Sequence, residues 1–271
     1  MNLNQKNREK TMKKTFLSAL LMSLCLTFSS GYAADLSEIL KNGEIKIAVP
    51  EAFAPFGSVG KSGEHEGYDV DVAKLIAKDL GVKLVLVPVV SKQRIPFLET
   101  NKVDLVISTM GANPKRAKSI NFSSAYAPFY SGVFAPASVN VNSYKDLDGL
   151  SIGVTGGTLE DLELTKNAPK GSKITRFGDN AATLSAIKSK QVQVLVAGNT
   201  AAASITESDP KFDLQRKFII KDSPCFIGVK KGNEDLLRWV NVFILHKKLG
   251  GDLNKISQKW LGQDLPSLPS L

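Results

Sequence analysis

The stretch GYDVDVAKLIAKDLGVKLVLVPVV, residues 67–90, joins a helix pattern directly to a strand pattern. Apolar residues recur at helical spacing from Val72 to Leu80, and Gly81 is well placed to end the helix. The VKLVLVPVV run that follows is rich in β-branched and apolar residues, which is typical of a strand. A helix followed by a strand without a long loop favours an α/β fold.

The same alternation extends on both sides of this stretch. EIKIAVP (44–50) predicts a strand before it, and VDLVIST (103–109) predicts one after it. RIPFLETNK (94–102) lies between the later strands and predicts a helix with Pro96 in its first turn. Strands that alternate with helices indicate a mostly parallel sheet with helices on both faces.

The pattern then restarts, which predicts a second lobe. LSIGVTGGT (150–158), KITRFG (173–178) and VQVLVAG (192–198) read as strands, and NAATLSAIKSK (180–190) as a helix. FIGVKKGN (226–233) predicts a late strand, followed by two amphipathic helices that are too little for a third domain. We therefore expect lobe 1 at residues 34–128 plus 224–271 and lobe 2 at 132–221, joined by two hinge crossovers.

The N-terminus has the three parts of a secretory signal peptide. Lys13 and Lys14 precede an apolar run at residues 15–28, and Gly31 with Ala33 forms a small-x-small cleavage site. We expect residues 1–33 to be removed and the protein to be exported to the periplasm. Without them 30 basic and 25 acidic residues remain, a net charge of +5 rather than the +9 of the whole chain.

Composition and motifs exclude several function classes. The modest positive charge is spread along the chain, so we expect no nucleic-acid partner. His65, His246 and Cys225 are too few and too scattered for a metal site or thiol catalysis, and no catalytic triad or phosphate loop stands out. Asp69 and Asp71 are interpreted as a helix cap and a first-turn complement to the helix dipole. We expect a monomer without cofactor or metal, and not an enzyme.

Several segments together resemble the periplasmic amino-acid-binding proteins of ABC importers, solute-binding protein family 3. They cover nearly the whole chain after residue 33 in the right order. The segments are FAPF (53–56), EGYDVDVAKLIAKDLG (66–81), RIPFLETNKVDLVIST (94–109), KRAKSINFSSAY (115–126) and LDGLSIGVTGGT (147–158). The resemblance implies a type II periplasmic-binding-protein fold, an amino acid trapped between two lobes, and an ABC permease in the inner membrane as partner.

The resemblance also assigns ligand-binding residues. Arg116 matches the arginine that pairs with the ligand's α-carboxylate, which suits a bidentate guanidinium fork. Phe53 matches the aromatic over the ligand's aliphatic part, and Arg94 matches an arginine that acidic-amino-acid binders use for a side-chain carboxylate. The further matches are Ser108, Thr109 and Gly111 for the head group, Gly111 through its backbone, and Thr158 in the second lobe. The structural alternatives are an exposed helix-start arginine for Arg116, core packing for Phe53, a helix-capping turn for Thr158 and a rim ion pair for Arg94.

The chain departs from the family pattern where the second lobe usually has an aspartate for the ligand's ammonium. Gly198 stands there, followed by Asn199, which could offer a carbonyl; Glu160 or Asp161 could also reach in. Ser91 replaces a second aromatic. We therefore expect a cation-rich, acid-poor cleft and an acidic or polar amino acid as ligand. A related organic acid without an α-ammonium is the alternative, and a cyclohexadienyl-dehydratase-like enzyme, with Glu51, Glu160 or Asp161 as acid, is less favoured.

Overall fold

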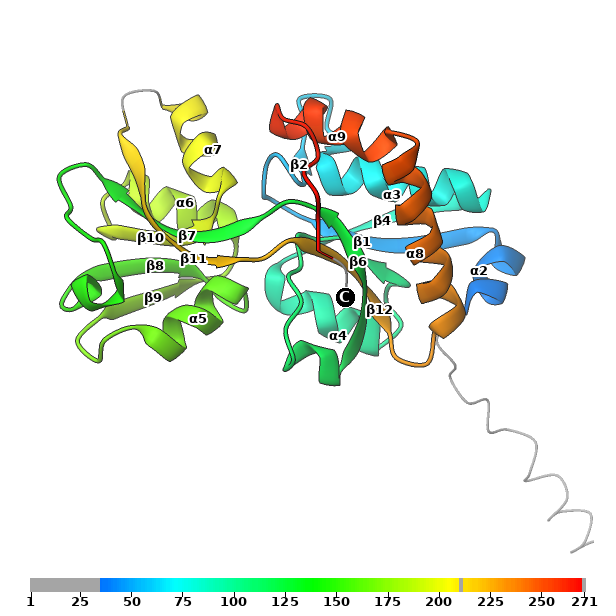
Figure 1. Cartoon of the computed structure of the whole chain (residues 1–271), viewed down its shortest axis with the longest axis horizontal. Coiled ribbons are helices and arrows are strands. Elements are labelled where there is room, and N and C mark those ends of the chain that lie inside the picture. The colour runs from blue at the N-terminus through cyan, green and yellow to red at the C-terminus, as the bar shows by residue number, and fades with distance from the viewer. Residues whose placement is uncertain (1–34, 210–211, 270–271) are drawn as a thin grey trace, which may run out of the picture. The chain divides into compact units, whose positions relative to one another are not determined.

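The computed structural model of the protein describes residues 35–209 and 212–269. The signal peptide expected at residues 1–33 lies outside these ranges. None of the helices within them combines the length and the apolar character that a membrane crossing requires. The described residues form two five-stranded sheets and one small hairpin, with helices packed around the sheets, the α/β two-lobed fold that the sequence predicts (Figure 1).

The first lobe is built on a five-stranded sheet in the order β4-β1-β5-β12-β6. Its strands are β1 (Glu44–Pro50), β4 (Lys83–Val89), β5 (Leu105–Val106), β6 (Ile120–Ala127) and β12 (Cys225–Lys230), with a small hairpin of β2 (Ser58–Val59) and β3 (His65–Glu66). Its helices are α2 (Leu36–Asn42), α3 (Tyr68–Leu80), α4 (Arg94–Glu99), α8 (Glu234–Leu249) and α9 (Asp252–Leu261). Gly81 ends α3 with a left-handed φ of 68°, as its position in the sequence predicts.

The second lobe is built on a sheet in the order β11-β7-β10-β8-β9. Its strands are β7 (Tyr130–Pro136), β8 (Ser151–Thr155), β9 (Lys173–Phe177), β10 (Val194–Gly198) and β11 (Leu214–Asp222). Its helices are α5 (Leu159–Asn167), α6 (Asn180–Lys188) and α7 (Thr200–Ser208). Short 3₁₀ helices lie at Ser91–Gln93, Arg116–Lys118 and Tyr144–Leu147.

Both sheets are mixed rather than mostly parallel. β1 pairs in parallel with β4 and β5, and β8 pairs in parallel with β9 and β10. β12 is antiparallel to β5 and β6, and β7 is antiparallel to β10 and β11. The antiparallel strands are those that lead into and out of the second lobe, and of these the sequence patterns single out only β12.

The two connections between the lobes run side by side (Figure 1). One leads from β6 into β7 and the other from β11 into β12. The backbone N–H of Ser223 in the second connection donates to the Phe129 carbonyl in the first at 2.9 Å. Each lobe has its own apolar core, so the lobes are joined by two chain segments rather than by one shared core.

Candidate ligand-binding site

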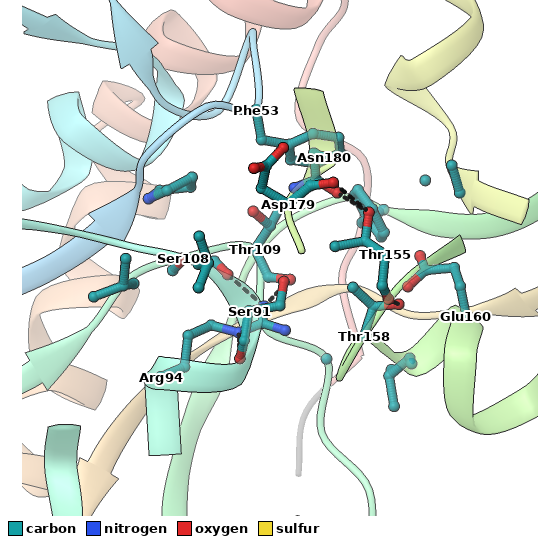
Figure 2. A pocket seen from close by; sticks show the side chains of 18 of the residues that line it. Phe53, Ser91, Arg94, Ser108, Thr109, Thr155, Thr158, Glu160, Asp179 and Asn180 are labelled. Carbon is teal, nitrogen blue, oxygen red and sulfur yellow. Dashed lines mark hydrogen bonds between the residues drawn. The ribbon is translucent and has the colours of Figure 1, made fainter. Parts of the chain in front are cut away.

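A pocket lies at the carboxyl ends of strands from both sheets, where ligands bind in open α/β folds. Pro50 ends β1, Thr155 ends β8 and Gly198 ends β10, and all three line the pocket. It encloses about 670 Å³ of space, counting the part that opens to solvent. Figure 2 shows first-lobe Arg94 and Ser108 on one side and second-lobe Thr158 and Glu160 on the other.

The structure gathers seven of the eight predicted ligand-binding residues around this pocket. They are Phe53, Arg94, Ser108, Thr109, Gly111, Arg116 and Thr158. Asn199 is not among the lining residues, although its neighbour Gly198 is. The Asn199 Oδ1 atom is buried without a hydrogen-bond partner among the described residues.

The turn after β5, residues 108–111, forms the first-lobe wall and is held through its backbone. Arg94 Nη1 donates to the carbonyls of Ser108 at 2.7 Å and Thr109 at 3.3 Å. Asp69 Oδ2 accepts from the Thr109 backbone N–H at 2.8 Å. The interpretation of Asp69 as a helix cap is therefore wrong: Gly67 is the N-cap of α3, and the Asp69 side chain points into the fold instead.

Arg116 is buried, with 7% of its surface exposed, so it is not the exposed helix-start arginine of the alternative reading. Its Nη1 donates to the Gly111 carbonyl at 2.8 Å, and its Nη2 donates to the Gly157 carbonyl of the second lobe at 2.9 Å. These bonds use two of the five guanidinium N–H groups, so donors remain for a ligand. Burial lowers the pKa of Arg116, an effect that the Glu160 charge opposes.

Arg94 is buried beneath the same wall, with 5% of its surface exposed. Its Nε donates to the Ser91 carbonyl at 3.1 Å, while Nη2 makes no hydrogen bond to a described residue. Desolvation, reinforced by the nearby Arg116 charge, lowers the pKa of Arg94 to about 9, so the guanidinium stays charged at neutral pH. Arg94 thus lies inside the pocket wall and does not form a rim ion pair.

Gly111 brings the first-lobe wall very close to the second lobe. A Cβ at this position would collide with the Leu159 and Ser223 side chains. A side chain here would have to displace the ends of the Leu159 and Ser223 side chains, so a glycine allows the present close approach of the two walls. The backbone at residue 111 is therefore the part of this residue that is available to a ligand.

Thr158 begins the second-lobe wall and has the geometry of a helix cap. Its Oγ1 accepts from the Asp161 backbone N–H at 3.2 Å and donates to the Thr155 carbonyl at 2.8 Å. Phe53 likewise shows core packing while it lines the pocket: its ring stacks on Phe56 at a centroid distance of 5.9 Å. Thr158 therefore caps α5 and Phe53 packs against Phe56, as the structural alternatives expected, and both residues also line the pocket.

Acidic groups also line the pocket, which corrects the expectation of an acid-poor cleft. Glu160, in the first turn of α5, is 6% exposed, and its Oε1 accepts from Ser131 Oγ at 2.8 Å. Asp179 caps α6 and accepts from the Ala182 backbone N–H at 2.7 Å. Glu51 is exposed at the edge. Asp161 is not among the lining residues and pairs with Arg176 at 2.7 Å.

Sequence reasoning missed Asp179, Asn180 and Thr155, which form one hydrogen-bonded corner of the pocket. The Thr155 hydroxyl donates to Asn180 Oδ1 at 2.9 Å (Figure 2). Asp179 and Asn180 follow KITRFG directly, so they stand where a predicted parallel strand gives way to a predicted helix. The rule that ligands lie beyond carboxyl strand ends could have pointed to them.

Phe129 explains why residue 198 has no side chain. A Cβ at Gly198 would stand 2.6 Å from Phe129 Cε2 and closer still to Cζ. Phe129 lines the pocket and packs edge-on against Phe53, with a centroid distance of 6.3 Å. An aspartate at residue 198 would need the space that this ring fills, and the second-lobe acids that line the pocket are instead Glu160 in α5 and Asp179 at the start of α6.

Comparisons with known proteins agree with this architecture. Residues 45–263 match the family model for bacterial extracellular solute-binding proteins, family 3. The chain is 29% identical over 234 residues to the ABC transporter glutamine-binding protein GlnH of Bacillus subtilis, covering 84% of this chain and 85% of that protein.

Two solved structures show the same fold. A mutant of the T. maritima protein ArgBP has a TM-score of 0.79 and 28% identity, covering 84% of this chain and 99% of that one. A solute receptor for L-cysteine of Neisseria gonorrhoeae has a TM-score of 0.78 and 30% identity, covering 84% and 94%. The family resemblance and the type II periplasmic-binding-protein fold expected from the sequence are both confirmed. This chain belongs to the bacterial extracellular solute-binding proteins, family 3.

Proposed function

We propose that this protein captures a small α-amino acid with an acidic or polar side chain and delivers it to an ABC permease. The observation that carries the proposal is the arrangement of charge in the pocket. Arg94 and Arg116 line the first-lobe wall, and Glu160 and Asp179 line the second-lobe wall. A zwitterion has a carboxylate and an ammonium on one carbon, and opposed charged walls are complementary to such a ligand.

The ligand's α-carboxylate is placed at Arg116. A guanidinium binds a carboxylate through parallel, charge-assisted hydrogen bonds, and Arg116 keeps unused N–H groups. Thr109 and Gly111 border the same space and add polar and backbone groups. Because Arg116 also donates to the Gly157 carbonyl of the second lobe, a carboxylate bound here would contact an arginine that already joins both lobes.

The ligand's α-ammonium is placed at Glu160, with Asp179 nearby. Glu160 Oε1 accepts from Ser131, while Oε2 makes no hydrogen bond to a described residue and is available to a cation. Removing a buried charge from its partner costs several kcal/mol, so a ligand without an ammonium would satisfy this wall poorly. For this reason an organic acid that lacks the ammonium is the weaker candidate.

The side chain of the ligand would lie between Phe53 and the polar lining. Phe53 offers an apolar ring for the methylene groups, and Arg94 Nη2 or Asn180 can bond to a carboxylate or amide end. Only a form with both walls close offers both sets of contacts, so binding would shift the lobes towards closure. The permease would then recognise the closed form, after export of the protein to the periplasm and removal of residues 1–33.

The test is a thermal-shift screen of the protein without residues 1–33 against the twenty amino acids and small di- and keto-acids, followed by calorimetry. Stabilisation by acidic or polar amino acids supports the proposal, since a ligand stabilises by mass action. Stabilisation only by acids that lack an ammonium would favour the organic-acid alternative. Product formation from a prephenate-type substrate would favour the enzyme.

A matched pair of variants tests the role of Arg116. Arg116→Ala should weaken binding of the ligand found in the screen at least about tenfold, because it removes a charge-assisted pair worth about 1.5–3 kcal/mol. Lys118→Ala, at an exposed cation of the same 3₁₀ turn, should leave binding unchanged. Equal affinities of both variants would contradict the assignment of the carboxylate to Arg116.

A further inference from the structure

Asp69 is a fully buried carboxylate behind the pocket wall, on the first turn of α3. Its Oδ1 accepts from the Tyr126 hydroxyl at 2.6 Å. Its Oδ2 accepts from the Thr109 backbone N–H at 2.8 Å and lies 3.4 Å from the Thr109 hydroxyl. The Tyr68 hydroxyl donates to the Tyr126 carbonyl at 3.0 Å, which fixes the strand that carries Tyr126. Asp69 does not line the pocket, so it acts on a ligand through these partners and through its charge, which faces the pocket residue Arg94.

Thr109, the residue that Asp69 holds, has an unusual backbone conformation. Its φ is +45°, in the left-handed region that a β-branched residue adopts only under strain. Such a conformation persists where the surroundings hold it in place. Here Asp69 binds the N–H of Thr109, and Arg94 Nη1 donates to its carbonyl on the other side.

The strained residue determines which way the pocket wall faces. The Met110 carbonyl accepts a hydrogen bond from the Phe226 N–H at 3.0 Å, and the Gly111 carbonyl accepts one from Arg116 at 2.8 Å. Thr109 is therefore the one left-handed residue between β5 and this anchored segment. If it relaxed to an ordinary conformation, the chain would leave β5 in a different direction, and Thr109 and Gly111 would move relative to Arg116.

We propose that Asp69 is a positioning residue of the ligand site, which holds Thr109 in its left-handed conformation from behind and thereby orients the 108–111 wall towards the ligand. The proposal rests on the proposed function for the identity of the site. Its structural part, the Asp69–Thr109 bond, does not depend on which ligand binds. A negative charge suits the role, because a carboxylate accepts stronger hydrogen bonds from an N–H than a neutral oxygen does.

The surroundings of Asp69 make its charge sensitive to pH. Burial raises the pKa of Asp69 to about 7, although hydrogen bonds from Tyr126 and Thr109 and the charge of Arg94 act in the opposite direction. The titratable groups that face it are Tyr68, Tyr126, Cys225 and Arg94. We therefore expect the strength of the hydrogen bond from the Thr109 N–H to Asp69 to change near neutral pH.

The experiment compares Asp69→Asn with Asp71→Asn, using L-glutamine as the probe ligand. Asp71 is on the same helix turn but bonds to Lys259 and Trp260, each at 2.7 Å, away from the pocket. Asp69→Asn should speed hydrogen exchange of the Thr109 amide and weaken L-glutamine binding, each about tenfold, because a charge-assisted bond is replaced by a neutral one. Asp71→Asn should change neither quantity. If L-glutamine does not bind the unaltered protein, its choice as ligand fails, while Thr109 exchange still tests the bond.

A rescue variant separates positioning from general damage. Glycine adopts a positive φ without strain, so in a Thr109→Gly background Asp69→Asn should weaken binding by less than about threefold. Unchanged Thr109 exchange in Asp69→Asn, or equal loss of binding in Asp71→Asn, would overturn the proposal. If Asp69→Asn does not fold, the Asp69 carboxyl and the Thr109 amide are followed by NMR in the unaltered protein. A shared titration midpoint supports the proposal, and separate midpoints overturn it.

Discussion

The contact between Gly198 and Phe129 leads to a quantitative prediction. In Gly198→Ala the new methyl would stand 2.6 Å from Phe129 Cε2, well inside van der Waals contact, and Phe129 is itself packed against Phe53 and Phe56. Adding a methyl group to a filled space costs about 1–3 kcal/mol of unfolding free energy. We expect a loss of about 2 kcal/mol, because the ring can tilt but has aromatic neighbours on two sides.

The second variant of the cycle removes the ring. Phe129 is only partly buried, so Phe129→Ala should cost about 3 kcal/mol, the lower end for phenylalanine truncation. In the double variant the methyl at residue 198 no longer meets the ring and fills part of the space it left. The double variant should therefore lose about 3 kcal/mol rather than 5, a coupling of about 2 kcal/mol between the two positions.

Urea denaturation followed by circular dichroism measures all three free energies. Gly178→Ala is the matched control, because a Cβ at Gly178 meets no atom within 4 Å. It should change stability by less than about 1 kcal/mol. The reasoning is refuted if Gly198→Ala is as stable as the unaltered protein, or if the double variant loses the sum of the two single losses.

Three further predictions concern single residues. Glu160→Gln should weaken binding of L-glutamine about tenfold and binding of succinate, which has no ammonium, much less; equal losses by calorimetry would contradict the ammonium site. Thr158→Ala should lower the unfolding free energy by about 1 kcal/mol, whereas Thr158→Ser should keep it, as measured in urea. Burial raises the pKa of Asp69 from 3.8 to about 7. The contribution of Asp69 to the free energy of unfolding is therefore complete below about pH 4 and is lost as the pH rises through 7, a decline of at most about 4 kcal/mol. Asp69→Asn should flatten this decline of the unfolding free energy with pH.

Helices and strands whose apolar residues repeat with a clear local period are predictable from the sequence. The helix ended by Gly81 and the strands at 44–50 and 83–89 show their period within a single segment, and they form as expected. β12 was predicted although it pairs with the distant β6, whereas β6, β7 and β11 were not predicted. Their residues alternate less clearly where they cross between lobes, and pairing rather than propensity decides such strands.

The candidate site shows the same division. Arg116 and its neighbours could be predicted as candidates because the resemblance covers their segments, and the structure gathers them at one pocket. Asp179 and the inward direction of Asp69 depend on which strand ends meet, a matter of tertiary arrangement. Asp69 looked like a cap because it begins an apolar helix pattern, yet α3 starts at Tyr68, and its first turn is buried. A local rule cannot tell a buried first turn from an exposed one.

The position of β12 in the first sheet has a consequence for the order in which the two lobes fold. β12 lies between β5 and β6, so the first sheet has a gap until residues 225–230 are available. The strands of the second sheet, by contrast, all come from the continuous segment 130–222. Local contacts form before distant ones, since closing a long loop costs more entropy. We therefore expect the second lobe to fold first. In the first lobe, one edge of β5 should stay unpaired until the C-terminal part of the chain can add β12.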